Sequence, residues 1–171
     1  MKAAFIEQTG GPEVIQYGEL EDPRPEAGQV VVKMKAASVN PIDTYIRGGL
    51  VEMELPSPFI VGSDFSGTVE AVGEGVAEWK IGDRVWGANQ GGHGRQGTFA
   101  ELACVEQGWL HAIPEGIKEE DAAAVALVGI TAHIGLVLRA RVQEGETVFV
   151  NGGSGGWDRW WCRWPRHWAR G

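Results

Sequence analysis

The chain has 171 residues, 43% hydrophobic and 22% charged, a composition typical of a soluble globular protein with room for one domain or for a domain and part of another. Its formal net charge of −8 argues against binding to nucleic acid or to an anionic membrane surface. Cys104 and Cys162 are too few for a disulfide framework or a metal cluster. The sequence shows neither a signal sequence nor an apolar run of about 20 residues, so we expect a cytoplasmic protein.

The first hundred residues are predicted to form short strands separated by glycine- and proline-rich turns. Turn residues cluster at 10–12 and 22–28, and β-branched or alternating apolar residues lie between such clusters. Many short strands of this kind predict an antiparallel barrel or sandwich. The predicted strands are residues 3–6, 14–17, 30–34, 68–72, 84–86 and 97–105.

One short helix is predicted to interrupt the strands, over residues 41–46. Asn40 is a good N-cap, and Pro41 suits the first helical position because its missing N–H is not needed there. The pair Gly48 and Gly49 is predicted to end the helix.

The pattern changes near residue 115. Three consecutive acids at 119–121 precede a predicted helix at 122–127, and a second helix is predicted at 130–139, after Gly129. A β-branched strand is then predicted over residues 147–150, followed by a glycine-rich turn. This order predicts the entry to an α/β nucleotide-binding domain, so we expect one domain at 1–118 and the start of another at 119–156.

The glycine turn matches the first two positions of the dinucleotide-binding pattern G-x-G-x-x-G. Gly153 and Gly155 supply them, with Gly156 adjacent, but the third position holds Asp158. An aspartate there adds bulk where helix and strand should pack, and negative charge where a helix N-terminus should attract phosphate. We therefore expect the chain to carry out chemistry that needs a bound dinucleotide poorly by itself.

The last fifteen residues, 157–171, contain five of the eight tryptophans and resemble a stretch read one base out of frame. Tryptophan has a single codon, TGG, so a one-base shift turns each Trp into Val, Leu or Met, at the spacing of one helix face. The same shift turns Asp158 into glycine. We therefore expect 157–171 to be an aberrant, poorly ordered tail, a hypothesis that resequencing of these codons tests. A genuine aromatic and basic terminal segment is the alternative.

Four segments together resemble the medium-chain dehydrogenase/reductase superfamily. They are VNPIDTYIRGG (39–49), PFIVGSDFSGTVEAVGEGV (58–76), GDRVWG (82–87) and EEDAAAVALVGITAHIGL (119–136), in the order and spacing of the family. The resemblance implies a mainly β GroES-like barrel followed by the start of an α/β Rossmann domain, which is incomplete here. It also implies an active site in the cleft between the two, and a homodimer for the full-length family.

The residues at the metal positions of this superfamily point to its quinone oxidoreductase group. Metal-dependent members have a zinc-binding Cys where Asn40 stands, a His at Ser63 and an acid at Asp64. They also have a four-cysteine zinc lobe near 91–105, where only Cys104 lies. Asn and Ser are poor zinc ligands, so no metal site is expected. Ser63 and Asp64 are expected to fill the vacated metal pocket, and Cys104 to be a buried small apolar side chain.

The resemblance implies hydride transfer from NADPH to a quinone, with Asn40, Tyr45 and Asp43 as candidate catalytic residues. Asn40 and Thr131 would also contact the nicotinamide, and Gly153, Gly155 and Gly156 the rest of the cofactor. Each residue has a structural alternative. Asn40 is also an N-cap, Tyr45 also suits packing on the barrel, and Thr131 also suits a bond to backbone. Asp43 suits helix stabilisation better than catalysis.

Three further functional hypotheses stay open at this point. A relative within the class would reduce enones or other carbonyl compounds instead of quinones. An isolated GroES-like barrel would act as an interaction module, and an inactive fragment would have no activity. Isolated histidines, such as His93, are expected to be structural or surface residues and not ligands.

Overall fold

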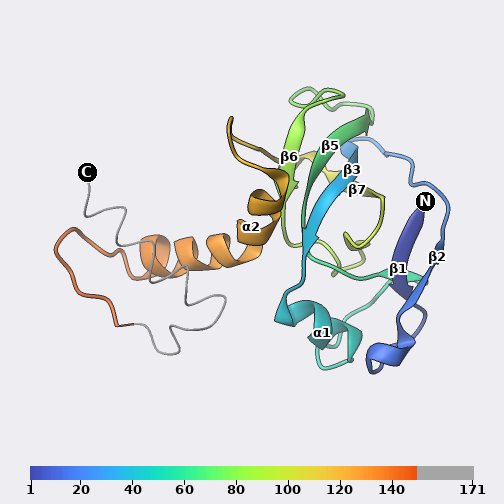
Figure 1. Ribbon diagram of the computed structural model, residues 1–171, viewed down its shortest axis with the longest axis horizontal. Coiled ribbons are helices and arrows are strands. Elements are labelled where there is room, and N and C mark those ends of the chain that lie inside the picture. The colour runs from blue at the N-terminus through green and yellow to red at the C-terminus, as the bar shows by residue number, and fades with distance from the viewer. Residues whose placement is uncertain (150–171) are drawn as a thin grey trace. The chain divides into compact units, whose positions relative to one another are not determined.

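A computed structural model describes residues 1–149 (Figure 1). The chain divides into two compact units, whose border falls between Ala124 and Val125. This border lies six residues beyond residue 118, where the sequence places the end of the first domain. The units are therefore described separately, and everything up to Ala124 belongs to the first.

The larger sheet of the first unit has five antiparallel strands in the order β7-β3-β5-β6-β8. Its longest members, β3 (Gln29–Ser38) and β5 (Asp64–Val72), lie side by side in Figure 1. The others are β6 (Arg84–Gly87), β7 (Leu102–Glu106) and β8 (His111–Ala112). Apolar residues of β3, β5, β6 and β7 and the residue just before β8 form one core, which contains Val30, Val32, Phe65, Val69, Val85, Ala103, Val105 and Leu110.

A smaller sheet has the order β2-β1-β4 and joins the first through the segment that precedes β7. Its strands are β1 (Lys2–Ile6), β2 (Gln16–Glu19) and β4 (Phe59–Ile60). Ala3 forms an isolated bridge with Ala100. The many short antiparallel strands confirm the predicted mainly β fold.

The helix predicted at 41–46 is confirmed as α1 (Pro41–Arg47), and Gly48 follows it as C-cap. Its buried Ile46 packs with Ile6, Phe59 and Val61 in a second core cluster. This packing holds the C-terminal end of α1 against the barrel, and the partly buried Ile42 packs against the same cluster near the N-terminal end.

Several predicted strands have different bounds. The strand predicted at 14–17 begins at Gln16, because Pro12–Val14 forms a 3-10 turn that the proline initiates. The strand predicted at 97–105 begins at Leu102. The residues before it donate isolated backbone hydrogen bonds to the end of β4 and to the residue after it, from Gly97 N to Ile60 O at 2.8 Å and from Phe99 N to Val61 O at 2.9 Å. β4 and β8 were not predicted, since two residues show no periodicity.

The prediction of two separate helices at 122–127 and 130–139 is wrong. Helix α2 (Glu119–His133) runs through Gly129 and continues directly as a π-helical segment, Ile134–Arg139. A glycine inside a helix costs only about 1 kcal/mol, which the flanking helix formers outweigh. The whole stretch, Glu119–Arg139, is long and apolar enough to cross a membrane by length and composition alone, contrary to the sequence expectation.

The prediction of a strand at 147–150 is wrong for residues 147–149, because residues 146–149 have no regular secondary structure. A strand is held by backbone hydrogen bonds to a neighbouring strand, and no strand within residues 1–149 pairs with this segment. Val150, Gly153, Gly155, Gly156, Asp158 and the tail at 157–171 lie outside the described residues.

Candidate functional site

The candidate site is built around Asn40, the residue that joins β3 to α1. Its backbone is extended, with φ −114° and ψ 154°, and its side chain is 4% exposed. The backbone N–H of Asn40 donates to Oδ2 of Asp43 at 2.7 Å, and the N–H of Asp43 donates to the carbonyl oxygen of Asn40 at 3.0 Å. These reciprocal bonds fix the first turn of α1 relative to the end of β3.

Asp43 is buried although it lies on a short surface helix. It is 3% exposed, and its second oxygen, Oδ1, accepts a hydrogen bond from the hydroxyl of Ser63 at 2.8 Å. Burial raises the pKa of the Asp43 carboxyl above its ordinary value, against the smaller lowering by the bonds from Asn40 and Ser63. Asp43 therefore links α1 to the segment that leads into β5.

Asp64 approaches Asn40 from the other side. It is 0% exposed, and its Oδ2 accepts hydrogen bonds from Nδ2 of Asn40 at 2.9 Å and from the hydroxyl of Ser38 at 2.9 Å. Asp64 and Ser38 are direct partners across the β3–β5 pair. Two buried carboxylates thus converge on one asparagine, at the place where the end of β3, the start of α1 and the start of β5 meet.

The structure brings together four of the residues singled out from the sequence: Asn40, Asp43, Ser63 and Asp64. Ser38 is a fifth member that sequence reasoning missed. No local signal marks it, since a serine near a strand end is common, and only the register of β3 against β5 places it opposite Asp64.

Tyr45 and Thr131 are not members of this network. Tyr45 lies on α1 with 47% of its surface exposed, and within residues 1–149 its hydroxyl makes no hydrogen bond. Thr131 belongs to the second unit and lies inside α2, where its hydroxyl donates to the carbonyl oxygen of Leu127 at 2.9 Å. Gly153, Gly155 and Gly156 lie outside the described residues.

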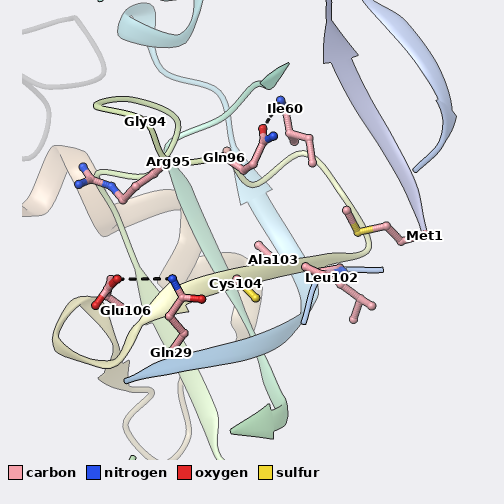
Figure 2. A pocket seen from close by; sticks show the side chains of 12 residues that line it. Met1, Gln29, Ile60, Gly94, Arg95, Gln96, Leu102, Ala103, Cys104 and Glu106 are labelled. Atoms are coloured by element: carbon pink, nitrogen blue, oxygen red, sulfur yellow. Dashed lines mark hydrogen bonds between the residues drawn. The ribbon is translucent and has the colours of Figure 1, made fainter. Parts of the chain in front are cut away.

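Figure 2 shows a pocket elsewhere on the barrel, of about 220 Å³, lined by Met1, Ile60, Arg95, Leu102 and Cys104 among others. The guanidinium of Arg95 lies 5.2 Å from the ring centre of Trp109. Burial, and to a smaller extent the charge of Glu26, raise the pKa of Cys104 to about 11. Its thiol is therefore protonated at neutral pH and a poor nucleophile.

Comparison with known proteins agrees with this architecture. Residues 26–115 match the family model described as the alcohol dehydrogenase GroES-like domain. A quinone oxidoreductase of Homo sapiens is 36% identical over 157 residues, which cover 91% of this chain and 46% of that protein.

Two solved structures are similar over nearly the whole chain. An alcohol dehydrogenase superfamily protein from Novosphingobium aromaticivorans has a TM-score of 0.89 and 39% identity, and the match covers 98% of this chain and 50% of that one. The quinone oxidoreductase of Escherichia coli complexed with NADPH has a TM-score of 0.88 and 29% identity, with 99% and 50% covered. The chain thus spans about half the length of the relatives it matches.

Proposed function

Because the chain belongs to the alcohol dehydrogenase GroES-like family, in the quinone oxidoreductase group of the medium-chain dehydrogenase/reductase superfamily, we propose that it forms part of an NADPH-dependent quinone reductase that works without metal. The reaction takes one hydride from NADPH and one proton from solvent and converts a quinone to its hydroquinone. Under this proposal residues 1–118 form the catalytic domain and 119–156 begin the cofactor domain of a cytoplasmic homodimer.

The observation that carries the proposal is the hydrogen-bonded network around Asn40. Metal-dependent relatives are expected to bind zinc with side chains at positions 40, 63 and 64. Here Asn40 and Asp64 bond to each other, and Ser63 bonds to Asp43. An amide and a hydroxyl are weak zinc ligands, and both are already engaged, so this arrangement favours chemistry that depends on positioning and polarity.

Thr131 and Asn40 each have a hydrogen-bonding group of the kind that the carboxamide of a nicotinamide binds. Thr131 has committed its only proton to Leu127, so its oxygen is left as a hydrogen-bond acceptor for an amide N–H. Asn40 has a second N–H besides the one donated to Asp64. We propose that these two residues hold the nicotinamide, and that Gly153, Gly155 and Gly156 hold the pyrophosphate.

NADPH, when bound, supplies the hydride, and the protein supplies position and proton donors. Tyr45 presents an exposed phenolic hydroxyl, a donor suited to a quinone oxygen on which charge develops. Asp43 acts through its bonds to Asn40 and Ser63 as a positioning group, since both of its carboxylate oxygens are occupied. Under this proposal Asn40 contacts the cofactor and is held in place by its hydrogen bonds to Asp43 and Asp64.

The proposal is tested by NADPH oxidation at 340 nm with 1,4-benzoquinone as acceptor. The assay uses the 171-residue chain and the longest protein that contains it, each with and without a zinc chelator. We expect the longer protein to show quinone-dependent oxidation that the chelator does not change and that Asn40→Ala lowers by about a hundredfold, and the 171-residue chain to show little. Activity that the chelator abolishes, or NADPH consumption with an enone but no quinone, would overturn the proposed chemistry.

A further inference from the structure

We propose that Asp64 is a positioning residue that sets the orientation of the Asn40 side-chain amide, and that Ser38 holds Asp64 in place for this task. The inference rests on the proposed function, in which Asn40 contacts the cofactor or the substrate. Its own support is the geometry of the three side chains.

The chemistry of the two groups decides which end of the amide faces Asp64. A carboxylate oxygen accepts hydrogen bonds, so the end of Asn40 that lies 2.9 Å from Oδ2 of Asp64 is the Nδ2 end. The two ends of an amide are nearly equal in size, so packing alone would not distinguish them. If the amide turned over, Asn40 would present an acceptor wherever it now presents a donor.

Asp64 is itself held rigidly enough to impose this choice. It is the first residue of β5 and pairs with Ser38, the last residue of β3. The next residue, Phe65, is 0% exposed and packs in the central core, which anchors the strand at this point. A slip of one residue would turn Asp64 to the opposite face, so the core packing that fixes the register also fixes Asp64.

Ser38 completes the arrangement and ties it to α2. Its hydroxyl lies 2.9 Å from Oδ2 of Asp64 and 3.0 Å from the carbonyl oxygen of Ala123. Ser66, two residues after Asp64 on β5, makes a similar bond, from its hydroxyl to the carbonyl oxygen of Glu119 at 2.7 Å. Both serine hydroxyls therefore lie within hydrogen-bond distance of carbonyl oxygens at the start of α2, and that of Ser38 also lies beside the carboxyl group of Asp64.

This difference provides a matched set of variants. Asp64→Asn keeps the size of the side chain but adds donors where only acceptors stood, so the Asn40 amide is free to turn over. Ser38→Ala removes the hydroxyl whose single proton is shared between Asp64 and the carbonyl oxygen of Ala123 in α2. Ser66→Ala removes a bond to α2 alone and is the control. Circular dichroism first establishes that each variant is folded.

The first readout is the pair of side-chain amide signals of Asn40 in a ¹⁵N–¹H NMR spectrum of the chain, assigned by their loss in Asn40→Asp. We expect Asp64→Asn and Ser38→Ala to shift these signals and to speed their exchange with water, and Ser66→Ala to leave them unchanged. Unchanged Asn40 signals in Asp64→Asn, or equal shifts in both serine variants, would overturn the inference.

The second readout is the quinone assay, which tests whether the orientation matters for catalysis. We expect Asp64→Asn to lower kcat/KM by about tenfold and Ser66→Ala to leave it within about twofold. Wild-type kcat/KM in Asp64→Asn would overturn the catalytic part of the inference. Absence of activity in the unmutated protein would count against the proposed function alone, and the NMR result would still decide whether Asp64 orients Asn40.

Discussion

At Asp43, burial and hydrogen bonding act in opposite directions on one carboxyl group. Burial favours the neutral form, whereas the bonds from Asn40 and Ser63 favour the charged form, and burial has the larger effect on the pKa. The sequence indicated a helix-stabilising acid at this position, and the reciprocal bonds with Asn40 agree with that role. The bond to Ser63 is non-local and was not predictable.

The raised pKa of Asp43 predicts a specific dependence of stability on pH. The folded chain binds this proton more tightly than the unfolded chain, whose ordinary value is 3.8. The contribution of Asp43 to stability is therefore fully present below that value and is lost as pH rises through the raised pKa. Asn at this position does not titrate. We expect the unfolding free energy of the wild type, minus that of Asp43→Asn, to fall as pH rises.

Urea unfolding of both proteins at a series of pH values from about 3.5 to 7 measures this difference. A difference that rises with pH would show that the hydrogen bonds, and not burial, dominate at Asp43.

Cys104 is partly buried and not fully buried as the sequence predicted, and burial is the larger cause of its raised pKa. Its pKa, raised from 9.0 to about 11, leaves about a hundredfold less thiolate at pH 8 than an ordinary cysteine has. We expect iodoacetamide to alkylate Cys104 at least about a hundredfold more slowly in the folded chain than in urea. Peptide mass spectrometry follows Cys104 separately from Cys162. Equal rates in both conditions would mean that the thiol is open to solvent and unperturbed.

At the scale of elements, the pairing of β3 with β5 determines where the site lies. The register of this pair shifts between Val31 and Val32 and again between Met34 and Ala36. Such irregularities bend a strand, and the backbones of β3 and β5 approach each other closely at Gly67. The paired ends then bring Ser38 and Asp64 together.

The close crossing predicts that Gly67 tolerates no side chain. A Cβ at this position would overlap the carbonyl oxygen of Lys33 and lie 2.8 Å from Cγ1 of Val32. We expect Gly67→Ala to destabilise the chain by about 3 kcal/mol, because backbone must move. At Gly108 a Cβ would meet nothing within 4 Å, so Gly108→Ala should change stability by no more than about 0.5 kcal/mol.

Urea unfolding of the two glycine variants provides the comparison. Equal effects of Gly67→Ala and Gly108→Ala would contradict the tight crossing of β3 and β5.

Helix α2 shows how one misread residue changes the description of an element. Reading Gly129 as a break concealed the continuous stretch Glu119–Arg139, which has the length and composition of a membrane span. Its first turn is polar, however. Glu119 accepts a bond from Arg84 at 2.8 Å, and its carbonyl oxygen accepts one from Ser66. These contacts fasten the start of the helix to the barrel.

At the scale of the whole molecule, the polar contacts at the start of α2 lead us to expect that the chain does not insert into membranes. Inserting the helix would break its contacts with Arg84 and Ser66 and would desolvate the acids at 119–121, at a cost of several kcal/mol. We expect the chain to stay in the supernatant when it is centrifuged with neutral phosphatidylcholine vesicles. Centrifugation without vesicles separates membrane binding from self-association through exposed apolar residues such as Leu138 and Phe149. Pelleting that requires vesicles would contradict this expectation.

The sequence alone was sufficient for features that depend on neighbouring residues. Local alternation located β1, β3, β5 and β6, and the Asn40–Pro41 cap with the Gly48–Gly49 stop located α1. Four spaced segments together indicated the family that the comparisons show. Capping, turn formation and strand alternation act over a few residues, so their signals survive in the sequence.

The tertiary structure decided what depends on residues that are far apart in the chain. Only the register of β3 and β5 joins Ser38 to Asp64, and only the fold buries Asp43 against Ser63. The same reason explains the wrong predictions. Gly129 stays helical because its neighbours continue α2, and residues 146–149 form no strand because a strand exists only with a partner.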